Sequence, residues 1–128
     1  MTDAHNKAMK KILLAMLLAT PLSAVAAGPQ MFIGKHLIEW AEAHTTYAAG
    51  DMSPKKAVQS ALLLGYVMGV ADSATALGGL CIPLSAKKGE LVNIVVQYST
   101  KNPKVASDGG QDVVYDALRA RYPCPKKK

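Results

Sequence analysis

The chain has 128 residues and a formal net charge of +6, and half of its residues are hydrophobic. The length corresponds to a single domain with a modest hydrophobic core. Most of the charge lies at the two ends, because residues 1–26 carry a net +2 and residues 126–128 are three lysines. The body between them is close to neutral, which excludes the strongly basic surface that is typical of nucleic-acid-binding proteins.

The amino-terminal leader has the layout of a secretory signal peptide. Met9-Lys10-Lys11 is a short basic start, an apolar run follows it, and Ala24-Val25-Ala26 matches the small-residue pattern before a cleavage site. The apolar run is too short to span a bilayer, which takes roughly 20 residues. We therefore expect a signal peptide over residues 1–26, with Met9 as an alternative start, a mature domain over residues 27–125 and a solvated basic tail over residues 126–128.

Two cysteines, Cys81 and Cys124, remain after removal of the leader. An even number of cysteines in a small exported domain indicates a disulfide. Closing a loop of roughly 44 residues removes unfolded-state entropy equivalent to about 4 kcal/mol in the chain-entropy model. A metal site is the weaker interpretation, because two isolated cysteines without a nearby histidine cannot fill four ligand positions.

The second of the predicted helices is the element around which the chain is organised. It starts with Ser53 as N-cap and Pro54 in the first position, and Gly78-Gly79 ends it. Since its first half is apolar on nearly every face, we expect other helices to surround it. A membrane span is the weaker hypothesis, because the uncharged run is short and Asp72 would lie inside the bilayer. Apolar periodicity predicts four helices in all, over residues 31–49, 54–77, 86–100 and 111–121.

These patterns predict an all-α fold, a small four-helix bundle tied by one disulfide, with five helices as an alternative. The β-branched run Ile94-Val95-Val96 would also suit a strand, but the polar residues around it recur at helical period. We expect Ser85 to cap the third helix. Asp108 is the predicted cap of the fourth, with Gln111 as its capping-box partner.

No arrangement of residues in this sequence points to catalysis. The carboxylates are few and scattered, and Asp72 is expected to be a structural polar group that fixes the packing of the second helix. His36 and His44 are eight residues apart on one helix, about 80° out of register, so they do not converge on a metal with Glu39. We therefore expect no enzymatic activity, no cofactor and no metal ion, and a protein that binds or inhibits something.

Four segments of the chain resemble the Rap/Tai immunity proteins of type VI secretion systems. The resemblance extends over residues 53–125, and its motifs occur in the family's order. They are Gly65-Tyr66-Val67-Met68-Gly69-Val70-Ala71-Asp72 with Cys81-Ile82-Pro83, Gly89–Tyr98 leading to Asn102-Pro103, Val114–Leu118, and Tyr122-Pro123-Cys124.

The resemblance implies a small helical periplasmic protein, often a homodimer, that neutralises a peptidoglycan amidase effector injected by sibling cells. In this family inhibition is steric, through a loop or helix end placed in the effector's Cys–His groove. The family's disulfide maps onto Cys81 and Cys124. The implied partner is a cell-wall amidase, and no nucleic acid and no membrane insertion after signal cleavage are expected.

Contact residues are expected in the polar loop before the last helix, because a loop can enter a groove without disturbing the core. The candidates are Lys101, Asn102, Lys104, Ser107 and Asp108. An ordinary solvated loop is the alternative interpretation of these residues. The alternative function is a stand-alone periplasmic stress or chaperone-like protein of the same fold, since a fold does not determine a function.

Overall fold

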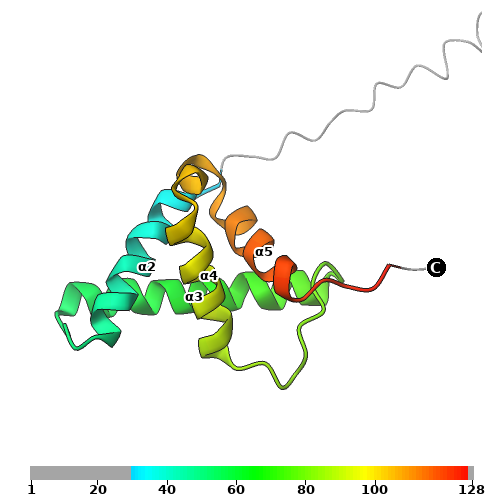
Figure 1. Cartoon of the computed structure of the whole chain (residues 1–128), viewed down its shortest axis with the longest axis horizontal. Helices are drawn as coiled ribbons and strands as arrows, with labels where there is room; N and C mark the ends of the chain where they lie inside the picture. The colour runs from blue at the N-terminus through cyan, green and yellow to red at the C-terminus, as the bar shows by residue number, and fades with distance from the viewer. Residues whose placement is uncertain (1–29, 127–128) are drawn as a thin grey trace, which may run out of the picture.

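The computed structural model describes residues 30–126, so the predicted signal peptide lies outside the described residues. It contains α2 (Gly34–Ala48), α3 (Pro54–Ala76), α4 (Lys88–Lys101), the 3-10 helix η1 (Pro103–Ser107) and α5 (Gly110–Arg121) (Figure 1). Within the described residues there is no β-strand, only one isolated bridge between Ile33 and Gly109. The predicted all-α bundle with one disulfide is confirmed.

The three shorter helices pack on one side of α3, the longest helix (Figure 1). The buried residues of α3 recur at three- and four-residue steps, which places them on a single face. The other elements complete one contiguous core with that face. Its largest fully buried apolar members are Leu37, Leu63, Val67, Leu80, Val92, Val95, Val113, Val114 and Leu118.

The expectation that other helices surround α3 is wrong for its outer face. Leu62 and Leu64 are 45% and 42% exposed, Val58 is more exposed still, and nothing approaches the missing Cβ of Gly65 or Gly69. By length and composition alone α3 would also pass for a membrane-spanning helix, with 17% of the relevant window buried. The physical reason is geometric, because three shorter helices cover only one side of a 23-residue helix.

Three predicted helix starts differ from the observed ones, and the first helix begins at Gly34 rather than at residue 31. The third predicted helix begins at Lys88, because the amide of Ala86 donates to the carbonyl of Pro83 (2.9 Å) and closes a turn that includes Ser85. Ser85 is therefore not an N-cap. The N-cap of α5 is Gly109, which has no side chain to cap the helix, and the predicted cap Asp108 does not cap it either.

The start of α5 is capped instead by Gln30, which lies far away in sequence. Its side-chain oxygen accepts a hydrogen bond from the amide of Gln111 (3.1 Å), and its side-chain nitrogen donates to Asp112 (2.8 Å). Asp108 has another role, because its carbonyl accepts from the amide of Gly34 (2.8 Å) at the start of α2. The first and last helices thus begin side by side.

Candidate partner-binding surface

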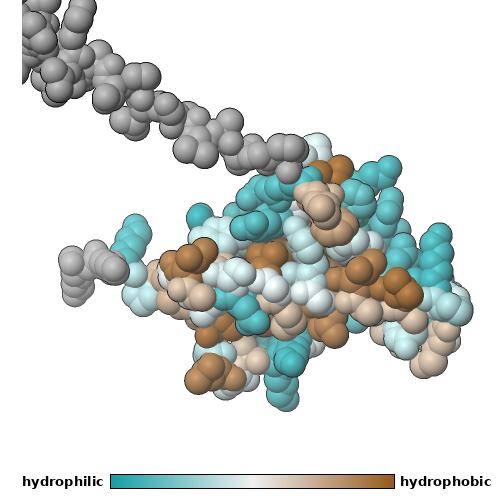
Figure 2. All heavy atoms as spheres, turned by 180° about the vertical axis from the view of Figure 1, so that it is seen from behind, coloured by the Kyte–Doolittle hydropathy of each residue, from teal (hydrophilic) through white to brown (hydrophobic). Residues whose placement is uncertain are grey.

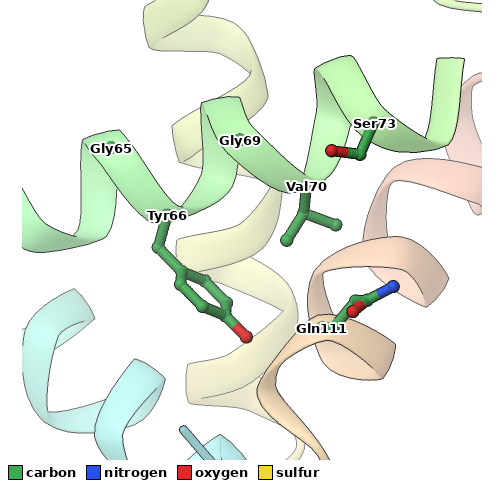
Figure 3. A pocket seen from close by; sticks show the side chains of 6 residues that line it. All are labelled: Gly65, Tyr66, Gly69, Val70, Ser73 and Gln111. Carbon is green, nitrogen blue, oxygen red and sulfur yellow. The ribbon is translucent and has the colours of Figure 1, made fainter. Parts of the chain in front are cut away.

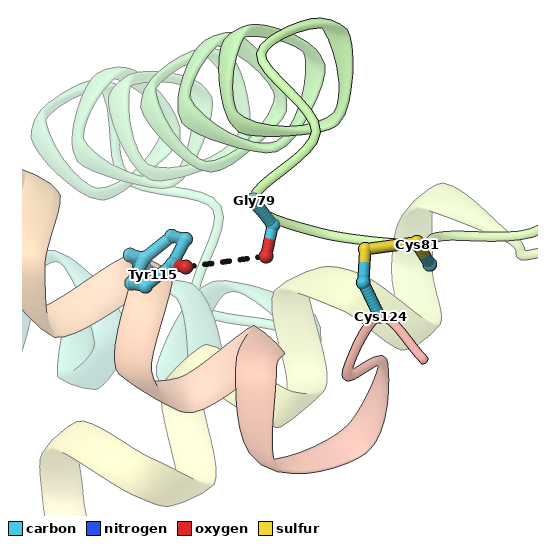
Figure 4. Close-up of a disulfide and its surroundings, with 4 residues drawn as sticks. All are labelled: Gly79, Cys81, Tyr115 and Cys124. Atoms are coloured by element: carbon cyan, nitrogen blue, oxygen red, sulfur yellow. Dashed lines mark hydrogen bonds between the residues drawn. A yellow bond between two sulfur atoms is a disulfide. The ribbon is translucent and has the colours of Figure 1, made fainter. Parts of the chain in front are cut away.

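The connection between α3 and α4, Leu77–Lys87, extends away from the helices (Figure 1) and is here called the α3–α4 loop. The disulfide between Cys81 and Cys124 ties it to the chain end beyond α5, with the two Cα atoms 4.9 Å apart (Figure 4). This confirms the predicted pairing.

Several contacts besides the disulfide hold the base of this loop. The Tyr115 hydroxyl of α5 donates to the carbonyl of Gly79 (3.1 Å; Figure 4), and the amide of Cys81 donates to the carbonyl of Tyr122 (3.2 Å). Leu80 between them is 1% exposed and belongs to the core. The first part of the loop is therefore fixed against α5.

The tip of the loop carries an apolar side chain in full contact with solvent. Leu84 is a corner residue of the turn that Ala86 closes onto Pro83, and its side chain is completely exposed. Burying an exposed leucine side chain is worth roughly 1.5–3 kcal/mol. A partner could bury a leucine held in this way at the end of an anchored loop without disturbing the core. The sequence analysis did not single out Leu84, whose exposure is evident only from the structure.

A hollow of about 480 Å³ lies between the α3–α4 loop and α3. Leu84 and Ile82 line it from the loop and Met68 from the helix, with Asp72 and Lys88 as its charged lining residues. Asp72 is exposed to solvent there. The loop thus presents an apolar tip on one side and an apolar hollow on the other.

The predicted contact segment before the last helix is less free than a polar loop would be. Lys101 ends α4, and the side-chain amide of Asn102 donates to the carbonyl of Tyr98 (2.7 Å). The residues that follow form η1, which the buried Val105 attaches to the core. Of the five candidates, Lys101, Lys104, Ser107 and Asp108 are exposed and Asn102 is half-buried.

The outer face of α3 is a second surface with apolar character. It contains a hollow of about 390 Å³, with Gly65 and Gly69 on the helix and the side chains of Tyr66 and Gln111 directed toward it (Figure 3). Burial, together with the Asp112 carboxylate, raises the pKa of the Tyr66 hydroxyl. Figure 2, which views the molecule from behind, shows hydrophobic side chains distributed over this side.

The titratable groups do not assemble into a reactive site. Among residues 30–126, no three His, Cys, Asp or Glu residues are placed to hold a metal ion. Nδ1 of His36 accepts a hydrogen bond from the amide of Ile33 (3.1 Å), and Nδ1 of His44 lies 2.7 Å from the hydroxyl of Ser60. Both histidines therefore have structural partners, one at a helix start and one between α2 and α3.

Two comparisons with known proteins bear on the function. A family model described as Rap1a immunity proteins matches residues 33–124, which include both cysteines and the four α-helices of residues 30–126. A search of curated proteins finds no matching relative.

Proposed function

We propose that this chain, which belongs to the family of Rap1a immunity proteins, is a periplasmic protein that binds and sterically inhibits a peptidoglycan amidase effector of a type VI secretion system. Family membership supports a protein effector as the partner. The amidase activity of that effector and the periplasmic location go beyond family membership and are part of our proposal. A disulfide between Cys81 and Cys124 is consistent with an oxidising compartment.

The observation that carries the proposal is the anchored α3–α4 loop with Leu84 at its tip. Its base is fixed by the disulfide and by Tyr115, so little conformational entropy is lost when the tip is buried in a partner. Steric inhibition needs no reactive group on the inhibitor. The loop tip is free to enter a partner, whereas η1 attaches the segment from Lys101 to Asp108 to the core. We therefore assign the inhibitory contact to the loop tip.

The test measures inhibition of the producing cell's amidase effector by the full chain purified from the periplasm. We expect stoichiometric inhibition by the wild type and a Leu84→Asp variant with at least about 30-fold weaker binding, as is typical of an interface hot spot. Met52→Asp is the matched control, because Met52 is also a largely exposed apolar residue but lies before α3. An amidase that the wild type leaves fully active would refute the proposed function.

The location is tested separately by fractionation of cells that express the full chain. We expect a shortened protein in the periplasmic fraction, with residue 27 or 28 at its amino terminus. An uncleaved protein in the cytoplasm would contradict both the signal peptide and the periplasmic assignment.

We further propose that a second copy of the chain covers the outer face of α3. From Ala57 to Ala71 this helix has no charged residue, so the same face of two copies can meet without like-charge repulsion. Gly65 and Gly69 leave open space where another helix could approach closely. Tyr66 and Gln111 line the hollow and would supply hydrogen bonds to the second copy.

Light scattering of the purified protein tests the dimer. Gly65→Leu has room within the chain, and leucine favours a helix more than glycine does, so the variant should fold and be a monomer. Gly89→Leu is the matched control, because that helical glycine also has open space around it. A monomeric wild type, or a dimer that Gly65→Leu leaves intact, would show that this assignment is wrong.

The exposed apolar residues of α3 also favour a second candidate function, that of a chaperone-like protein. If the face stays uncovered in solution, it offers an apolar surface to partly unfolded proteins. The measurement is aggregation of reduced lysozyme, followed by turbidity, with the chain added at equal molar ratio. Suppression that Leu62→Asp abolishes would favour this function, and unchanged aggregation would exclude it.

A further inference from the structure

A groove of about 400 Å³ runs between α4 and α5, apart from the loop tip and from the outer face of α3. Its apolar lining comes from Ile94 and Tyr98 of α4 and from Ala117 and Ala120 of α5. The only charged residues among those that line it are Lys101 and Arg121, and both are positive. The groove therefore combines an apolar floor with two cations.

The two cations lie at opposite ends of the groove. The helices α4 and α5 run in opposite directions (Figure 1), and the Tyr122 hydroxyl just after α5 donates to Glu90 in the first turn of α4 (2.9 Å). Lys101 in the last turn of α4 is therefore distant from Arg121 in the last turn of α5. The stretch of α4 from Ile94 to Lys101 is about 10 Å long at the helical rise.

No acidic residue lines the groove. Glu90 lies beyond its end and accepts the hydrogen bond of Tyr122. The Arg121 guanidinium lies 5.9 Å from the centre of the Tyr122 ring and forms no ion pair among the described residues. Among the described residues Lys101 takes part in no ion pair.

We propose that this groove binds an extended, acidic segment of a protein partner. A span of about 10 Å corresponds to three residues of extended chain. Side chains three residues apart point to opposite edges of such a segment, so one acidic residue faces Lys101 on the α4 side and the other Arg121 on the α5 side. The two residues between them alternate toward the same two helices, so apolar side chains there contact Ile94 and Tyr98 of α4 or Ala117 and Ala120 of α5. Identifying this partner with the effector rests on the proposed function. The preference of the groove for an acidic segment rests only on its own lining residues.

The first experiment uses a synthetic peptide, so that it does not depend on any amidase. An extended eight-residue peptide with two glutamates three apart and leucines between them is titrated into the isotope-labelled full chain. We expect amide shift changes confined to residues 94–101 and 117–121, and binding about tenfold tighter than that of the same peptide with lysines. Equal binding of the two peptides, or shifts elsewhere, would overturn the proposal.

Charge variants of the protein provide the second measurement. Lys101→Glu/Arg121→Glu should weaken binding of the acidic peptide by about tenfold or more, and Lys101→Gln/Arg121→Gln by less. The control Lys35→Glu/Lys55→Glu makes the same change in net charge at two exposed lysines outside the groove, and should bind as the wild type does. Loss of binding in the control as well would show that only the overall charge matters.

The two proposals can fail separately. If the acidic peptide binds the groove but the amidase is not inhibited, the groove stands and the proposed function falls. If the amidase is inhibited equally by the wild type and Lys101→Glu/Arg121→Glu, and the acidic peptide fails to bind, the function stands and the groove falls. Circular dichroism of each variant confirms that it is folded.

Discussion

Removal of the disulfide should lower the unfolding free energy by an amount that follows directly from the length of the loop it closes. Cys81 and Cys124 are separated by 43 positions in the chain. In the chain-entropy model a loop of this length restricts the unfolded state by about 4 kcal/mol at 25 °C. The variant Cys81→Ser/Cys124→Ser should therefore lose about 2–5 kcal/mol of unfolding free energy, a large share of the 5–15 kcal/mol typical of a domain.

The folded state should change little in this variant, because other contacts hold the same segment. The buried Leu80, the amide of Cys81 bonded to Tyr122 and the hydroxyl of Tyr115 bonded to Gly79 all remain. The loss therefore comes mainly from the unfolded chain. For a domain near 100 residues, a loss of about 3 kcal/mol corresponds to a fall in Tm of roughly 12–24 °C.

Urea unfolding of the oxidised wild type and of the double variant, followed by circular dichroism, measures the difference. The wild type unfolded in the presence of dithiothreitol is the control, and it should match the variant. Equal unfolding free energies for the oxidised wild type and the variant would refute the reasoning. That result would mean that the disulfide constrains a segment already restricted in the unfolded chain.

Two further predictions concern packing and pH. A methyl group at Gly34 would collide with the carbonyl oxygen of Val105, so Gly34→Ala should lower the unfolding free energy by about 2 kcal/mol or more. Gly89 has open space around it, so Gly89→Ala should raise the unfolding free energy by about 0.5–1 kcal/mol. Urea unfolding checks both, and a neutral Gly34→Ala would contradict the close contact. Burial, followed by the hydrogen bond to Glu90, raises the pKa of Tyr122 above its usual value of 10.0. The protonated Tyr122 hydroxyl therefore contributes fully to the unfolding free energy below pH 10, and this contribution is lost as the pH rises through the pKa of the folded state. Tyr122→Phe should make the unfolding free energy fall less steeply between about pH 9 and 11, as measured by urea unfolding at each pH.

The helices themselves could be predicted from the sequence because their signals are local. Pro54 after Ser53 starts α3, and Gly78 beyond its end has the positive φ of +77° that glycine adopts easily. The exposure of α3 could not be predicted, because composition does not reveal how many helices are available to cover it. An apolar helix in a bundle of shorter helices leaves one face open.

The helix caps illustrate a second limit. Asp108 and Gln111 have the spacing of a capping box, yet Gln30 satisfies the amide of Gln111 instead. The two glutamines are 81 positions apart, so no local pattern indicates this contact. Tertiary structure supplied a different partner, and the carbonyl of Asp108 became available for the start of α2.

The segment in which contact residues were expected is attached to the core more firmly than its polarity suggests. The segment from Lys101 to Asp108 is polar, which is typical of an exposed connection, but η1 attaches it to the core through Val105. Cys81-Ile82-Pro83-Leu84 is apolar and would ordinarily suggest burial. Leu84 is exposed because the chain is fixed at Cys81 and then turns outward at Pro83.

The anchored loop and the α4–α5 groove meet at the end of α5, which connects their proposed roles. Arg121 lines the groove, the carbonyl of Tyr122 accepts from Cys81, and Cys124 holds the loop by the disulfide. A single partner can therefore contact the groove and the loop tip together, and two linked contacts bind more tightly than either alone. The hollow on the outer face of α3 reaches Gln111 at the start of α5 but shares no lining residue with the groove, so a second copy bound at Gly65 and Gly69 leaves Lys101 and Arg121 uncovered. Each subunit of such a dimer would then present its own complete surface to one effector.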